Sequence, residues 1–135
     1  MGTYDRAIDA AMNGDLDTLK NMYDEGYLIC DDVLGYAARS GRWQILEWAL
    51  ENRFYLGAQA CAAAAEHGNF DLLRRLVEAG NEMDQNTTAG AAVNGHYDIL
   101  LWTLENGCNI THNVKYYCQL RAYKLPQQLK EHLQF

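Results

Sequence analysis

Apolar side chains recur along the chain three and four residues apart, the spacing that places them on one face of an α-helix. The pattern is clearest in residues 70–77 and 97–104. Its period is about 3.6 residues rather than the 2 of a strand. The chain is therefore expected to consist of short amphipathic helices.

The same arrangement of residues occurs four times, at intervals of 27 positions. A glycine marks each occurrence, an alanine pair stands just ahead of it, and a leucine follows five residues later. The glycines are Gly14, Gly41, Gly68 and Gly95. So many positions in register indicate an internal repeat, and an internal repeat is the strongest indication of fold that a sequence can give.

Each repeat predicts two helices joined at the marking glycine. The first ends in the alanine pair, whose small side chains let neighbouring backbones approach closely. The second ends near Gly26, Arg53, Gly80 or Gly107, where glycine suits a helix C-terminus. The predicted helices cover residues 4–13, 16–25, 32–40, 43–52, 59–67, 70–79, 86–94, 97–106, 113–122 and 127–135.

One such hairpin cannot bury its own apolar face, whereas stacked neighbours can. The sequence therefore predicts an all-α fold, an α-solenoid of about five stacked helix–turn–helix repeats that form a single domain over residues 1–135. The predicted units are residues 3–29, 30–56, 57–83, 84–110 and 111–135, the last a degenerate C-terminal cap.

Several local features accompany these helices. Asp5 is a plausible N-cap, and Pro126 occupies the expected first position of the last helix. Trp48 and Trp102 stand at equivalent positions, which favours packing along the second helices over a role in binding. Phe54 is expected in a small apolar cluster under the connection between the predicted helices 43–52 and 59–67. A polar outer face is predicted for the last unit from Lys115, Lys124, Gln127, Gln128 and Lys130.

The third and fourth units resemble the ankyrin repeat. In the fourth unit the resemblance rests on Ala91-Ala92-Val93-Asn94-Gly95-His96-Tyr97-Asp98-Ile99-Leu100, followed by Glu105-Asn106-Gly107. Residues 10–29 and 37–56 match less closely, and the resemblance covers roughly residues 5 to 112. Ankyrin repeats run about 33 residues; the units here lack the segment that would hold the β-hairpin and its Thr-Pro-Leu-His sequence. The resemblance implies a shortened, ankyrin-like binding module in which the residue at position 96 is structural. Short repeats of this kind resemble those of large viruses, protists and intracellular bacteria, which makes a host factor one class of target.

Composition narrows the classes of function. A net charge of −7 argues against nucleic acid as a partner, and no apolar run of 18 residues predicts a membrane span. The N-terminus has neither a basic start nor an apolar block, so no secretion signal is expected. Cys61 and Cys118 are predicted to be buried thiols in a reducing, cytoplasmic environment. The spacing of cysteines and histidines predicts no zinc site, and no catalytic or cofactor motif is present, so we expect a protein that is not an enzyme.

The ankyrin resemblance also implies a concave binding surface, formed by the two residues after each alanine pair and by those that lead into each first helix. These positions vary between units while the framework stays constant, as a recognition surface on a fixed scaffold would. Unconstrained solvent-facing positions would vary in the same way, and the sequence leaves both interpretations open. The predicted partner-binding residues are Asp31, Asp32, Arg39, Ser40, Gln59, Glu66, His67, Gln85, Asn86, Val93, Asn94 and His112.

Two alternatives concern the ends of the chain. Val114, Cys118, Leu129 and Leu133 fall in a pattern that resembles a compressed SOCS box, which would make the protein a ubiquitin-ligase adaptor; a capping helix has the same pattern and is the interpretation we favour. Residues 1–33 hold eight acidic and two basic side chains, and residues 111–135 hold four basic and one acidic. This asymmetry predicts a solvated surface, which we prefer, or else weak end-to-end self-association or a partner of matching polarity.

Overall fold

The computed structural model describes residues 2–135, which form ten α-helices and one 3₁₀ turn and no strand. The first helices of the units are α1 (Thr3–Asn13), α3 (Asp31–Arg39), α5 (Gly57–His67), α7 (Gln85–Val93) and α9 (His112–Leu120). The second helices are α2 (Leu16–Asp24), α4 (Trp43–Glu51), α6 (Phe70–Glu78), α8 (Tyr97–Glu105) and α10 (Gln127–Leu133), the last preceded by the 3₁₀ turn η1 (Ala122–Lys124). Each predicted helix is present, with ends that differ from the prediction by no more than two residues. The all-α prediction is confirmed.

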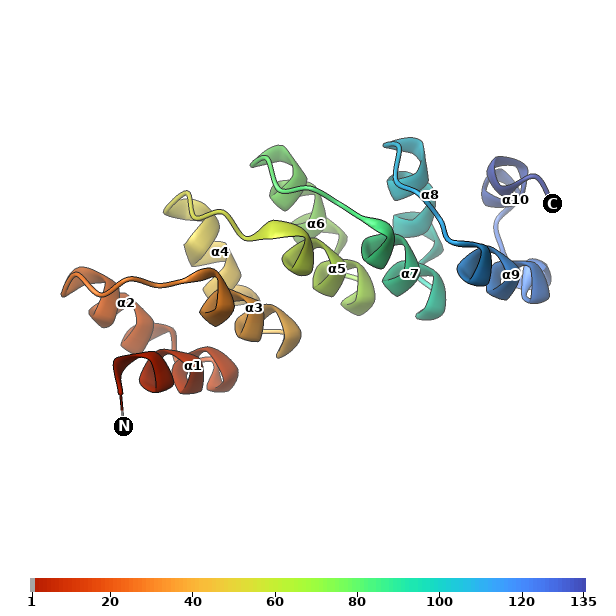
Figure 1. Cartoon of the computed structure of the whole chain (residues 1–135). Helices are drawn as coiled ribbons and strands as arrows, with labels where there is room; N and C mark the ends of the chain where they lie inside the picture. Colours follow the sequence, from red (N-terminus) through yellow and green to blue (C-terminus); the bar gives the residue numbers. More distant parts are fainter. Residues whose placement is uncertain (1) are drawn as a thin grey trace.

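The helices stand in two rows (Figure 1). In the inner row, each of α1, α3, α5, α7 and α9 packs on the next, and each pairs with the second helix of its own unit up to α7 and α8. In the outer row, α4 contacts α6, and α10 packs on α8. The two termini lie at opposite ends of these rows (Figure 1). This packing is consistent with a helical repeat arrangement.

The core lies between the two rows and is built from the repeated positions. The alanine pairs of the first four inner helices are no more than 5% exposed, and Leu19, Leu46, Leu73 and Leu100 of the outer helices are fully buried. Burying one leucine side chain contributes about 1.5–3 kcal/mol, whereas the alanines mainly allow close approach. The repeated leucine therefore supplies stability and the repeated alanines set the spacing of the inner row.

Aromatic residues join neighbouring outer helices, as predicted for Trp48 and Trp102. The Trp48 ring lies 5.7 Å from that of Tyr23 and 5.6 Å from that of Phe54, measured between centroids. The Trp102 ring lies 5.5 Å from that of Phe70. Phe54 thus belongs to a small cluster beneath its connection, which confirms that prediction.

The ends of several helices differ from the prediction. Gly2, not Asp5, is the N-cap of α1, and no side chain bonds the first turn, where Asp5 lies. Pro126 precedes α10 as its N-cap instead of being its first residue.

The C-terminal face is less polar than predicted. Lys124, Gln127 and Gln128 are exposed, but Lys115 and Lys130 are half-buried. Three apolar side chains on or next to α9 are exposed instead, namely Tyr116, Leu120 and Tyr123.

No helix within residues 2–135 has the length and apolar character that a membrane span requires.

Candidate functional site

A hollow of about 380 Å³ crosses the middle of the inner row, over α5. Its floor consists of alanine side chains of α5, and polar side chains from three inner helices and the residue ahead of α7 surround it. The lining residues are Arg39, Ala58, Gln59, Ala62, Ala63, Glu66, Asp84 and Asn86. We refer to it as the α5 hollow. It brings together four of the twelve predicted partner-binding residues: Arg39, Gln59, Glu66 and Asn86.

Glycines in the neighbouring helices allow the rim side chains to lie where they do. A Cβ atom on Gly35 of α3 would stand 2.7 Å from Gln59 Oε1. A Cβ atom on Gly90 of α7 would stand 3.3 Å from the Cβ atom and from the backbone nitrogen of Glu66. The Gln59 amide is the end of a flexible side chain and can move aside, whereas Glu66 meets Gly90 through its backbone and Cβ atom, so the position of Glu66 beside α7 depends on Gly90.

The rim of the α5 hollow carries both signs of charge. Arg39 lies over the ring of Tyr36, 5.2 Å from its centroid, and does not pair with Glu66. The two ion pairs found within the described residues, Arg74–Asp71 and Arg75–Glu47, both lie on the outer row. The guanidinium of Arg39 and the carboxylate of Glu66 therefore remain available to a partner.

Asp84 was not predicted as a site residue, and its carboxylate has a structural role as well. It accepts a hydrogen bond from the backbone N–H of Asn86 at 2.9 Å, and it forms a capping box with Thr87 at the start of α7. This arrangement fixes the wall of the α5 hollow that the start of α7 forms, because a capped helix start is held in place.

The remaining predicted residues are exposed but lie outside the α5 hollow. Asp31 and Asp32 line a separate hollow of about 320 Å³ together with Gln59, and Asp32 accepts a hydrogen bond from the hydroxyl of Tyr4 at 3.2 Å. Gln85 lines a third hollow of about 590 Å³, between the segments that follow α6 and α8.

Residues at the C-terminal ends of the inner helices point back to their own helices. The Nδ1 atom of His67 lies 2.9 Å from the carbonyl oxygen of Ala63, and Asn94 Nδ2 donates to the carbonyl of Gly90 at 2.8 Å. Ser40 occupies the equivalent end of α3 as its C-cap. The contacts of His67 and Asn94 satisfy helix-terminal carbonyls, so these two side chains have a structural role there.

Val93 and His112 complete the predicted set. The Val93 side chain is exposed at the end of α7, and its carbonyl accepts a hydrogen bond from the Tyr117 hydroxyl at 3.3 Å. His112 is the first residue of α9 and lies away from the α5 hollow.

Two side chains at the turns reach back to the preceding unit. Arg42 Nε donates to the carbonyl of Met12 at 2.9 Å, and His96 Nε2 lies 3.1 Å from the carbonyl oxygen of Glu66. Each spans a glycine of positive φ, Gly14 or Gly68, whose Cβ atom would meet the reaching side chain. The structural role expected for His96 is thus the joining of the third and fourth units, and its backbone partner belongs to a rim residue of the α5 hollow.

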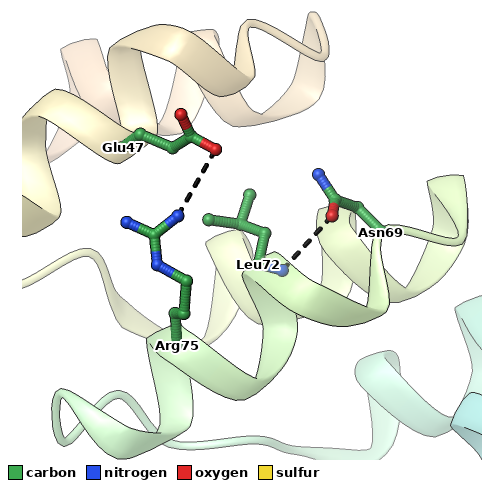
Figure 2. Close-up of polar contacts among 4 residues, drawn as sticks. All are labelled: Glu47, Asn69, Leu72 and Arg75. Carbon is green, nitrogen blue, oxygen red and sulfur yellow. Dashed lines mark hydrogen bonds and ion pairs between the residues drawn. The ribbon is translucent and has the colours of Figure 1, made fainter.

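The equivalent residues of the other units cap their own outer helices instead. Asp15 accepts from the backbone N–H of Thr18 at 3.1 Å, and Asn69 accepts from that of Leu72 at 3.2 Å. Figure 2 shows the Asn69 cap beside the Arg75–Glu47 contact, 3.4 Å long, which links α6 to α4. Both partners of that ion pair are 45% exposed, so its contribution to stability is small.

Asn81 is a buried polar residue that the repeat pattern does not reveal. It is 3% exposed, and its Oδ1 atom accepts from the backbone N–H groups of Leu56 and Gly57, both at 2.8 Å. Its Nδ2 atom donates to the carbonyl of Leu76 at 2.9 Å. Asn81 therefore fastens the start of α5, which forms the floor of the α5 hollow, to the end of α6.

The four cysteines are free, and two of them are buried as predicted: Cys61 and Cys118. Burial raises the pKa of the Cys61 thiol to about 12 and also raises the pKa of Cys118. Within residues 2–135, no group of three or more histidine, cysteine, aspartate or glutamate side chains is placed to hold a metal ion.

No model of a known protein family matches this chain, and no curated protein matches it significantly.

Proposed function

We propose that this protein is a noncatalytic binding module that holds a partner protein on its inner row, with the α5 hollow as the centre of the contact. The observation that carries the proposal is the α5 hollow itself. It has a volume of about 380 Å³ and an alanine floor, and exposed polar side chains of three consecutive units surround it. Pockets of this size are common binding sites, and a few convergent polar groups around an apolar floor supply specificity.

The chemistry of the rim indicates what the partner presents. Arg39 is the last residue of α3, Glu66 belongs to α5, and Asp84 directly precedes α7, so the charges come from three consecutive units. A protein segment with one acidic and one basic side chain on either side of a small apolar residue would satisfy both signs of charge. Electrostatic matching of this kind fixes the orientation of a partner more than it adds to affinity.

Several features support an ankyrin-like type of module. Paired short helices, a positive-φ glycine at each of the four turns and variable side chains on the inner row all fit that interpretation. Four free cysteines support a reducing compartment, and we propose a cytoplasmic location. A host factor as the partner remains a prediction that follows from the resemblance alone.

The proposal is tested by reversing the charges on the rim. Arg39→Glu combined with Glu66→Arg inverts the rim without a change in net charge. Lys20→Glu combined with Glu78→Arg makes the same exchange on exposed positions of the outer row and serves as the matched control. Each form is used to capture partners from cell extract, and bound proteins are identified by mass spectrometry and quantified.

A stoichiometric partner bound by the native chain and the control but lost by the rim variant is the expected result. A partner that all three forms retain equally would exclude the α5 hollow as the contact. Circular dichroism of each variant establishes that the helices are intact.

The adaptor alternative is tested in the same experiment. Leu129 is fully buried and Leu133 is 3% exposed, so the tail leucines of the SOCS-like pattern are part of the core, which favours the capping role. Recovery of elongin or cullin subunits with the native chain would favour the adaptor.

A further inference from the structure

Three large apolar side chains gather at the C-terminal end of the inner row. Tyr116 is 61% exposed, Leu120 is 57% exposed and Tyr123 is 78% exposed. Tyr116 and Leu120 lie four residues apart on α9 and therefore share one helix face.

The register of the repeat identifies that face. In α5 the equivalent residues are Ala62 and Glu66, which lie against Gly90 of α7. The same face of α3 meets the following inner helix, because a Cβ atom on Gly35 would stand 2.7 Å from Gln59 Oε1. Leu120 corresponds to Arg39, Glu66 and Val93, which are exposed within the array, but the positions equivalent to Tyr116 are buried or half-buried. The exposed Tyr116 therefore marks the position at which a further inner helix would pack.

The opposite end of the molecule offers the complementary face, but with different chemistry. Asp5 and Asp9 of α1 correspond in register to Asp32 and Tyr36 of α3, which face the preceding unit. Both aspartates are exposed. In the outer row Asn21 takes the place that Trp48 occupies in the next unit. The N-terminal face is therefore acidic and lacks an aromatic side chain.

Charge and register favour contact between these two ends. Residues 1–33 hold eight acidic and two basic side chains, and residues 111–135 hold four basic and one acidic. Lys124 lies over the ring of the exposed Tyr123, 5.7 Å from its centroid, whereas Arg121 stacks on Tyr117, whose hydroxyl bonds back to α7. The molecule also contains a precedent for the pairing, because the Tyr4 hydroxyl donates to Asp32 across the first junction. At a contact between copies, the same two positions would hold His112 and Asp5.

We propose that the C-terminal end of one copy docks on the N-terminal end of a second copy, so that α9 packs on α1 of the neighbour and both rows of helices continue. This proposal does not depend on the function proposed for the α5 hollow. A head-to-tail contact uses two different surfaces, so it leaves a free end on each copy and generates open chains rather than a closed dimer. The acidic and basic ends attract across solvent, so association weakens as salt shortens the Debye length from about 20 Å or more at low ionic strength to about 3 Å at 1 M.

Sedimentation velocity of the full chain, without added residues at either end, tests the proposal. The native chain is measured from low micromolar to near-millimolar concentration, at low and at high salt. One variant carries Asp5→Lys and Asp9→Lys on the acidic end, and a second carries Tyr116→Ser and Leu120→Ser on α9. Glu78→Lys with Glu105→Lys is the control, because it changes the net charge as the first variant does but at exposed positions away from both ends.

The expected result has four parts. The native chain and the control form oligomers of increasing size with concentration, and high salt lowers their association constant at least tenfold. Each end variant alone stays monomeric. An equimolar mixture of the two end variants forms a dimer and nothing larger, because each variant retains the end that the other lacks.

Other outcomes overturn the proposal. Dimers of the acidic-end variant alone would show that two C-terminal ends pair symmetrically. A native chain that stays monomeric at every concentration and salt would exclude self-association. Circular dichroism before each run verifies that the variants are folded.

Discussion

Replacement of Asn81 by alanine removes three hydrogen bonds at a buried position. The two backbone N–H groups that Oδ1 accepts from, those of Leu56 and Gly57, lose their partner, whereas the carbonyl of Leu76 still accepts from the backbone N–H of residue 81 at 3.0 Å. A buried polar group left without a partner costs about 1–3 kcal/mol. Leu56 is only 7% exposed, so its amide has little access to water, whereas Gly57 is half-buried and regains part of its hydration.

The expected loss in the free energy of unfolding is therefore about 1–3 kcal/mol, most of it from the amide of Leu56. Domains are stable by about 5–15 kcal/mol, so this single amide accounts for a substantial share. Equilibrium unfolding in urea, followed by circular dichroism and by tryptophan fluorescence, measures the change.

Asn106→Ala is the matched control. Asn106 is exposed and makes one hydrogen bond, from Nδ2 to the carbonyl of Trp102 at 2.7 Å, so the expected loss is at most about 0.5 kcal/mol. Hydrogen exchange supplies a local readout, because the amides of Leu56 and Gly57 should lose protection in Asn81→Ala but not in the control. Equal stability of the two variants, or unchanged protection of both amides, would refute the assignment of Asn81.

Three further predictions follow from backbone and burial. Gly68→Ala and Gly95→Ala each place alanine at a φ near +75°, which costs about 1–2 kcal/mol of stability, but only Gly68→Ala adds a Cβ atom 2.7 Å from the His96 ring. Gly68→Ala should therefore have the lower melting temperature. The additional destabilisation of Gly68→Ala should disappear when His96→Ala is also present. Arg53→Gly should stabilise by about 0.5–1 kcal/mol, seen as a higher melting temperature, because Arg53 has a φ of 62°, and an unchanged or lower value would contradict this. Cys61 should not react with a thiol reagent at pH 8 in the folded chain, because burial raises its pKa to about 12 and excludes the reagent; fast labelling under native conditions would disprove this.

The period of the sequence predicted most of the fold. Helix type, order and ends follow from apolar spacing and from glycines that take positive φ, such as Gly14 and Gly95, so the errors are confined to a residue or two. Asp5 was assigned as a cap from residue type, but the chain begins its first helix earlier, after Gly2. Such errors arise because a cap depends on where the first turn forms.

The candidate site was only partly predictable. The equivalent position in each unit identified Arg39, Gln59, Glu66 and Asn86, which the structure gathers around one hollow. Equivalent position does not determine side-chain direction, and His67 bonds its own helix.

Asn81 gave no signal in the sequence. The corresponding residues in other units are Tyr27, Phe54 and Cys108, none of which has an amide side chain. Its role depends on two adjacent backbone N–H groups, 24 and 25 residues away, which it meets only in the folded chain.

The reaching contacts of Arg42 and His96 also define a longer period. They stand 54 positions apart, as do Trp48 and Trp102, and the inner helices alternate between 11 residues in α1 and α5 and 9 in α3 and α7. Among the first four units, odd-numbered and even-numbered units are therefore not interchangeable, so the structural period there is a pair of units; α9 of the fifth unit, with 9 residues, departs from it. Excision of residues 30–83 would join the fourth unit to the first, so that an even unit follows an odd one, as in the native chain. His96 would then reach the Met12 carbonyl in place of Arg42. Excision of residues 57–83 alone would join two even units and disrupt this alternation, so an array of this kind should lengthen or shorten by whole pairs.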